Sequence, residues 1–146
     1  MSNKVYSITE ALCELMRDNW SQLGLTGRED VYYGDQPRYP RTPSIAVDSG
    51  PTTKSLNQIG MHAEETYLRY ILIFHSPIQS LQMTEQEIDQ HAETVADLLE
   101  QNRSLGGLVI HSHVTAIEPG LTERGGTLLK TTRLTWTGIS KTRIGA

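Results

Sequence analysis

The chain contains one pair of histidines whose spacing could hold a metal ion. His111 and His113 flank Ser112, and two residues with this spacing on a β-strand project to the same side of the sheet. A zinc site needs a third or fourth ligand, and no Asp, Cys or further His lies near the pair in the sequence. Histidines at a sheet surface or an interface are the more common arrangement. A metal-dependent hydrolase that uses His111 and His113 is therefore kept only as the less favoured alternative.

Other enzyme motifs are missing from the sequence. The segment His113–Thr115 matches half of a two-histidine phosphoesterase motif, but no second copy of the motif occurs. The chain has no glycine-rich phosphate loop and no Gly-x-Ser-x-Gly nucleophile elbow. Its single cysteine, Cys13, has no candidate base beside it. We therefore expect an interaction protein and not an enzyme, with no catalytic residue, no metal ion and no cofactor.

Length and composition restrict the class of protein further. The 146 residues are enough for one domain with a hydrophobic core, and the net charge of −4 argues against a general nucleic-acid binder. A single cysteine excludes an internal disulfide and fits a reducing compartment. No apolar run approaches the roughly 20 residues of a membrane span, and the polar start Met1–Lys4 does not resemble a signal peptide. We expect a protein that is made in the cytosol and has no membrane partner.

The segment His62–His75 is the most strand-like part of the chain, because its aromatic and β-branched residues favour a pleated sheet. Successive side chains of a strand point to opposite faces. One face is an apolar row that the rest of the chain must cover: Leu68, Tyr70, Leu72 and Phe74. The other face is mixed, which favours partial burial against a neighbouring subunit or a lumen: Tyr67, Arg69, Ile71, Ile73 and His75. We predict a central strand that ends at Ser76–Pro77.

Two segments have the pattern of amphipathic helices. Ser7–Glu10 has the spacing of a capping box, and apolar residues follow at helical spacing until Gly24 and Gly27 stop the helix. Thr84–Glu87 gives a second capping box, followed by an apolar stripe and an acidic outer face that extend to Arg103–Gly107. Acidic residues in the first turn of this second helix suit the helix dipole.

Alternating patterns predict three further strands, at residues 44–48, 108–118 and 128–138. Two long hairpin loops, Gly50–Gly60 and Pro119–Gly126, connect the strands in pairs. The predicted order is α-β-β-α-β-β. We expect an α+β fold in a single domain over residues 1–146, with a mainly antiparallel sheet packed by two helices.

Both loops are longer than a tight turn requires, which suggests that they contact a partner. Leu56 and Ile59 are the only apolar anchors in Gly50–Gly60, too few to offset an ordering entropy of roughly 1–2 kcal/mol per residue. We therefore predict that both loops are poorly ordered without a partner, and that Leu56 and Ile59 dock into it.

A proline-rich segment at about 30–43 and the end of the chain are further candidate contact regions. Three prolines among tyrosines and arginines exclude a regular helix and a central strand. Such an arm could contact another protein, because tyrosine and arginine are enriched at interfaces, or it could lie on its own domain. After Glu123 the sequence has no acid. The second helix is acidic, so the chain is asymmetric in charge, and three basic residues are candidates for a subunit or partner interface: Arg133, Lys141 and Arg143.

The layout as a whole resembles the tail terminator (tail completion) proteins of tailed bacteriophages. The features that carry the resemblance are an N-terminal helix, the strand entry Thr42–Val47, the long strand Tyr67–Phe74, the acidic helix from Thr84 and a closing strand pair that ends with Thr131–Gly138. The resemblance covers most of the chain. It is a pattern of elements without an invariant signature, so no catalytic residue is implied.

The resemblance implies a structural virion protein that assembles in the host cytoplasm. Such proteins form a ring, usually a hexamer, that caps the tail tube and joins it to a head-completion or connector protein. The genome passes through the lumen without sequence-specific binding. The arm at Tyr32–Pro43 and the long loops depart from the shortest family members and leave contact with a contractile sheath open. Another neck or head-completion connector protein is the alternative within the same class.

Overall fold

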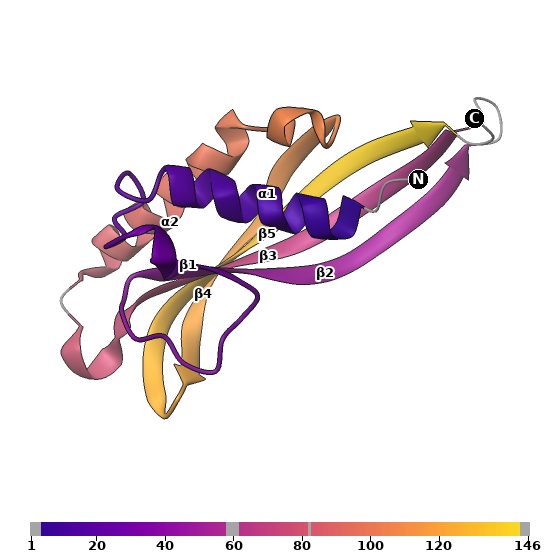
Figure 1. The fold of residues 1–146 in the computed structure, drawn as a ribbon. Helices are drawn as coiled ribbons and strands as arrows, with labels where there is room; N and C mark the ends of the chain where they lie inside the picture. The colour runs from indigo at the N-terminus through magenta and orange to yellow at the C-terminus, as the bar shows by residue number, and fades with distance from the viewer. Residues whose placement is uncertain (1–3, 58–61, 82, 144–146) are drawn as a thin grey trace.

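The structure is a computed structural model that describes residues 4–57, 62–81 and 83–143. Its α-helices are α1 (Lys4–Asp18) and α2 (Glu85–Gln101), and its strands are β1 (Val31–Tyr33), β2 (Ser44–Asn57), β3 (His62–Pro77), β4 (His111–Arg124) and β5 (Thr127–Arg143). Three short 3-10 helices are η1 (Arg28–Asp30), η2 (Ile78–Ser80) and η3 (Leu105–Gly107). The predicted α+β class and the order of its main elements are confirmed (Figure 1).

The five strands form one sheet in the order β1-β2-β3-β5-β4, with β3 at its centre. All neighbours are antiparallel except β1 and β2, which pair in parallel. The strand β1 was not predicted, because the segment 30–43 was interpreted as an extended arm. Prolines begin only at Pro37, so Val31–Tyr33 are free to pair with Ile45–Val47 at the sheet edge.

The main hydrophobic core lies between one face of the sheet and the two helices. Ile8, Leu12 and Met16 of α1 and Val95 and Leu99 of α2 belong to one buried cluster. The sheet contributes its central strands to the same cluster: Ile45, Val47, Tyr67, Ile71, Ile73, Leu134 and Trp136. The alternation predicted for residues 128–138 is confirmed, since Leu134 and Trp136 are fully buried.

The helices cover the mixed face of β3, and the predicted apolar row is fully buried only at Phe74, which belongs to a second cluster. Tyr67, Arg69, Ile71 and Ile73 are buried beneath the helices inside the domain, whereas Leu68, Tyr70 and Leu72 are half-buried on the helix-free face. The prediction that the mixed row faces a subunit or a lumen is therefore wrong. Alternation identifies which side chains share a face, but it does not say which face the helices will cover.

Arg69 can be buried because protein groups replace the water around its guanidinium. Its Nε donates to Oγ1 of Thr9 over 2.8 Å, and its two Nη atoms donate to the carbonyls of Leu68 (2.6 Å) and Val5 (3.2 Å). Burial still lowers the pKa of Arg69 from its ordinary value. The long side chain of Arg69 crosses the core from β3 to the start of α1, so this charged residue connects the sheet to the helix.

Most of the two predicted long loops, as far as the structure describes them, belongs to strands: residues 50–57 lie in β2 and residues 119–124 lie in β4. β2 continues to Asn57 and β4 continues to Arg124, where Gly125 and Gly126 make a two-residue turn with positive φ angles of 59° and 80°. Pro51 and Pro119 were taken as loop residues, but both lie where a strand has no outer neighbour, and an edge strand tolerates proline. Ile59 lies outside the described residues.

One predicted helix start is confirmed and the other is wrong. Thr84 accepts a hydrogen bond from the backbone N–H of Glu87, and the Glu87 side chain returns to Thr84, which forms the predicted capping box of α2. Ser7 does not cap α1, because that helix already includes Lys4. α1 ends at Asp18, and turns lead from there to Gly24, whose φ is 74°.

The arm from Gly34 to Pro43 lies on its own domain, against the helix-free face of the sheet. The Tyr39 ring stacks on Phe74 at 4.2 Å between centroids and meets Tyr32 edge-on. The Tyr39 hydroxyl donates to Asp35, whose carboxylate accepts hydrogen bonds from Arg124 of β4. Of the two alternatives left open by the sequence, the described contacts are those of an arm folded onto the chain itself.

Packing around Trp136 gives a direct test of the core. A Cβ added at Gly138 would overlap the six-membered ring of buried Trp136, whereas one added at Gly120 would meet nothing nearer than Thr131 Oγ1 at 3.9 Å. We expect Gly138→Ala to lower the free energy of unfolding by about 1–3 kcal/mol through overpacking. Gly120→Ala, the matched control on another strand, should change it by less than about 0.5 kcal/mol. Urea denaturation of both variants measures the difference, and equal stabilities would contradict this packing.

Candidate assembly surfaces

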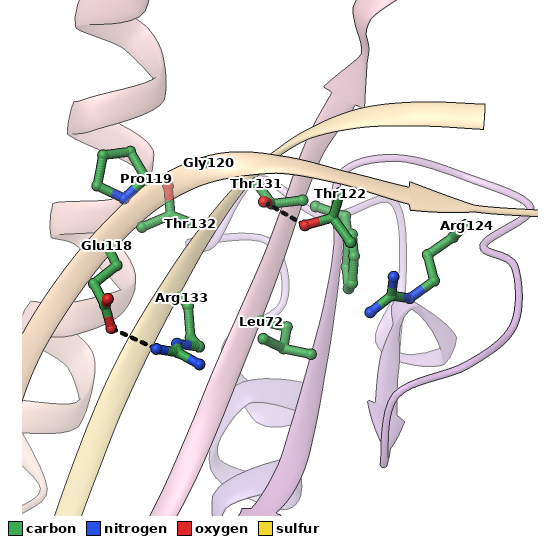
Figure 2. A pocket seen from close by; sticks show the side chains of 10 residues that line it. Leu72, Glu118, Pro119, Gly120, Thr122, Arg124, Thr131, Thr132 and Arg133 are labelled. Carbon is green, nitrogen blue, oxygen red and sulfur yellow. Dashed lines mark hydrogen bonds and ion pairs between the residues drawn. The ribbon is translucent and has the colours of Figure 1, made fainter.

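The helix-free face of the sheet carries an open groove of about 340 Å³, which we call the sheet groove. Figure 2 shows its lining side chains, which come from the three strands β3, β4 and β5. They are mainly apolar, hydroxyl and guanidinium groups: Leu72, Phe74, Glu118, Pro119, Gly120, Thr122, Arg124, Thr131, Thr132 and Arg133. The arm borders the groove at Phe74, where Tyr39 stacks.

Both arginines of the sheet groove are held by acids and by aromatic rings. Arg133 donates to Glu118 over 2.8 Å and lies 5.1 Å from the centre of the Tyr70 ring. Arg124 pairs with Asp35 and lies 5.8 Å from the centre of the Phe74 ring. Hydrogen bonds to these carboxylates raise the pKa of each arginine. The groove therefore offers fixed hydrogen-bond donors and stacking surface, which are suited to recognition and not to proton transfer.

The end of the β4–β5 hairpin exposes an apolar row, which we call the hairpin strip. Ile117, Leu121 and Leu128 are 52%, 56% and 43% exposed. In the strand register Ile117 stands opposite Leu134, and Leu121 stands opposite Lys130. The strip therefore continues the helix-side face of the sheet beyond α2. A groove of about 220 Å³ between α2 and β4, with Ile117 in its lining, begins the strip.

The opposite end of the sheet projects as a three-stranded tongue made of residues 50–57, 62–66 and 139–143. Figure 1 shows these parts of β2, β3 and β5 extending past the start of α1. The tongue contains three of the residues predicted to contact partners, because Leu56, Lys141 and Arg143 all occupy strand positions there. Lys141 is exposed, and its cross-strand neighbour is Glu64.

The predicted contact residues thus fall in three separate places. Tyr67, Arg69, Ile71 and Ile73 are in the core and are removed from any surface role. Arg133 lies in the sheet groove. The other predicted contact residues that the structure describes, Leu56, Lys141 and Arg143, are in the tongue. Sequence reasoning missed the hairpin strip, since it read Pro119–Gly126 as a loop. The alternation of Ile117, Pro119 and Leu121 was the signal that could have revealed it.

The His111/His113 pair lies at the start of β4 with both rings exposed. The ring centres are 5.7 Å apart, and Nδ1 of His113 is 3.5 Å from a Glu100 oxygen. The other Glu100 oxygen accepts the backbone N–H of Val114 over 2.6 Å, and this hydrogen bond is the main cause of the lowered Glu100 pKa. In the part of the chain that the structure describes, no group of three or more His, Cys, Asp or Glu could hold a metal ion.

A second histidine pair, which sequence spacing does not reveal, lies inside the domain. Nδ1 of His75 on β3 is 2.9 Å from Nδ1 of His91 on α2. The remaining ring nitrogens are also engaged: Nε2 of His75 with Oγ1 of Thr132 at 2.8 Å, and Nε2 of His91 with the carbonyl of Leu23 at 2.7 Å. Burial lowers the pKa of both rings. Residues 16 positions apart on different elements come together only through the fold.

Comparison with known proteins does not place the chain in a family. No family model matches it, and no curated protein matches it. Among the described residues, no helix is long and apolar enough to cross a membrane. The surfaces of this fold are therefore the basis on which its function can be proposed.

Proposed function

We propose that this protein is a structural subunit that forms a closed ring at the end of a phage tail tube and joins it to the head connector. The observation that carries the proposal is the exposed apolar row of the hairpin strip, at one end of a strand whose other end forms the tongue. The resemblance in element order to tail terminator proteins supports the same function. The proposed site of action is the virion neck, after assembly in the host cytoplasm.

Separate contact regions at the two ends of one molecule favour a ring over a symmetric pair. One end of β5 lies at the hairpin and includes Leu128, and the other end lies in the tongue and includes Lys141 and Arg143. When one end of a subunit contacts the other end of its neighbour, the contact is heterologous, and repeated rotation can close it into a ring. The resemblance implies six copies, and the hexamer is part of the proposal.

The charge of the chain fits a ring through which DNA passes. Non-specific DNA binding depends on lysine and arginine contacts to phosphates, and the chain has 13 such residues against 17 acids. The two arginines of the sheet groove are already paired, Arg124 with Asp35 and Arg133 with Glu118. We propose the tail tube protein and a head-completion protein as partners, with a sheath protein as a further partner in a contractile tail.

The proposal predicts a ring on purified tail tubes. We expect electron microscopy of tubes incubated with the protein to show one ring of six copies at a single end of each tube. The free protein can remain monomeric if the tube supplies the template. Tubes that carry one copy without a ring, or protein spread along the tube wall, would contradict the proposed function.

The hairpin strip should be needed for the ring but not for the fold. Because Ile117 and Leu121 are exposed, Ile117→Asp with Leu121→Asp should leave the urea midpoint nearly unchanged, while charges in an apolar contact should reduce ring formation at least 10-fold. Ile110→Asp is the matched control, since Ile110 is also 56% exposed but lies outside the strip. Ring counts on tail tubes measure the effect. Normal rings from the double variant would show that the strip faces solvent in the assembly.

A further inference from the structure

We propose that the His75–His91 pair is a proton-operated latch, which ties α2 and the segment after α1 to the sheet while both rings are neutral and releases them in mild acid. The proposal concerns the fold itself and does not depend on the ring. It rests on a cluster of four groups from four parts of the chain: Thr132 of β5, His75 of β3, His91 of α2 and the carbonyl of Leu23.

The direction of each hydrogen bond in the cluster follows from the last acceptor. The Leu23 carbonyl can only accept, so Nε2 of His91 carries the hydrogen. A neutral His91 then has a bare Nδ1, which accepts from Nδ1–H of His75. Nε2 of His75 is bare in turn and accepts from the Thr132 hydroxyl. All four ring nitrogens are used when both rings are neutral, and each tautomer is defined.

Protonation of one ring rearranges this series of hydrogen bonds, and protonation of both rings breaks it. If Nδ1 of His91 gains a hydrogen, His75 can still accept it, but only by moving its own hydrogen to Nε2 and turning the Thr132 hydroxyl from donor to acceptor. With both rings protonated, two N–H groups on two positive charges would face each other across 2.9 Å. The pair therefore favours neutral rings for a geometric reason as well as through burial.

The surroundings also disfavour positive charge on either ring. Burial, then the neighbouring His91 and then Lys130 lower the pKa of His75 to about 3. Burial lowers the pKa of His91, against the opposing effect of its hydrogen bond to Leu23. Lys130 pairs with Glu85 of α2, and Glu87, which borders His91, is engaged in the capping box. Among the described residues, no ion pair joins either ring to a carboxylate.

A surface pocket gives protons access to the pair and marks the part that would open. The pocket has a volume of about 280 Å³ and is bordered by Gly24, Pro43, Met83, Glu87, Gln90, His91 and Thr94. His91 joins the pocket to the buried ring of His75. Loss of the bond to Leu23 would free the turns after α1, and loss of the bond to His75 would free the first half of α2.

The sign of the pH dependence follows from linkage. A histidine in an open or unfolded segment has a pKa of about 6.5, above the lowered pKa values of the closed state. The open state therefore binds more protons in acid. The stability given by the latch is fully present above about pH 6.5 and declines as the pH falls towards the folded pKa values. Between pH 7.5 and 5.0, His75 alone, whose pKa is about 3 in the closed state, shifts the closed-to-open equilibrium by about 30-fold.

Two measurements on the full chain test the latch. In nitrogen-15 NMR of the imidazole rings at pH 6.0, we expect two neutral histidines, one protonated at Nε2 (His91) and one at Nδ1 (His75). In hydrogen exchange corrected for intrinsic rates, protection in residues 19–25 and 85–95 should fall at least 10-fold between pH 7.5 and 5.0, while protection in β3 and β5 changes less. The proposal would be overturned if the rings of His75 and His91 titrate near pH 6.5 in the folded protein. A loss of exchange protection that is uniform over the whole domain would also overturn it.

Variants separate this pair from the other histidines. His75→Gln with His91→Gln removes both titrating groups, and its protection in residues 19–25 and 85–95 should no longer fall between pH 7.5 and 5.0. His111→Gln with His113→Gln is the control, and should retain the wild-type pH dependence because both rings are exposed. If the first double variant does not fold, the ring NMR of the wild-type protein still decides the question. An unchanged pH dependence in a folded His75→Gln/His91→Gln variant would also overturn the latch.

Discussion

The sheet of this protein is longer than the helices that cover it, and much of the surface follows from that mismatch. α1 has 15 residues, which span about 22 Å at 1.5 Å per residue. β5 has 17 residues, which span about 56 Å at 3.3 Å per residue. A helix of ordinary length can cover only the middle of such a strand. The hairpin strip and the tongue are the two ends that remain, so the regions available for assembly arise from the same geometry as the core.

The middle of the sheet is held to the helices by polar side chains as well as apolar ones. Arg69 reaches Thr9 and the start of α1, and His75 reaches His91 of α2. Polar groups inside a core destabilise it unless each finds a partner, and then they restrict how the layers can slide. Each helix thus has its own polar connection to β3, in addition to the apolar cluster that both share.

Sequence reasoning predicted the elements of this fold better than it predicted their surroundings. The α+β class and the capping box at Thr84 depend on local patterns, and both are confirmed. The buried face of β3 was assigned wrongly, because Arg69 and His75 favoured partial burial against another subunit or a lumen until their partners on other elements were known. Pro51 and Pro119 were read as loop residues for a related reason. A proline has this meaning only when its strand has neighbours on both sides, and strand order is not a local property.

The placement of α2 links the proposed assembly region to the proposed latch. Glu100 near its end accepts the backbone N–H of Val114 on β4, Glu85 at its start pairs with Lys130 of β5, and His91 between them holds β3 and Leu23. The groove that begins the hairpin strip is formed by α2 and β4 together. Release of His91 would loosen the first half of α2, whose residues Asp89, Ala92 and Glu93 form one wall of that groove. A shift in the latch would therefore change the shape of the hairpin strip where a neighbouring subunit is proposed to bind.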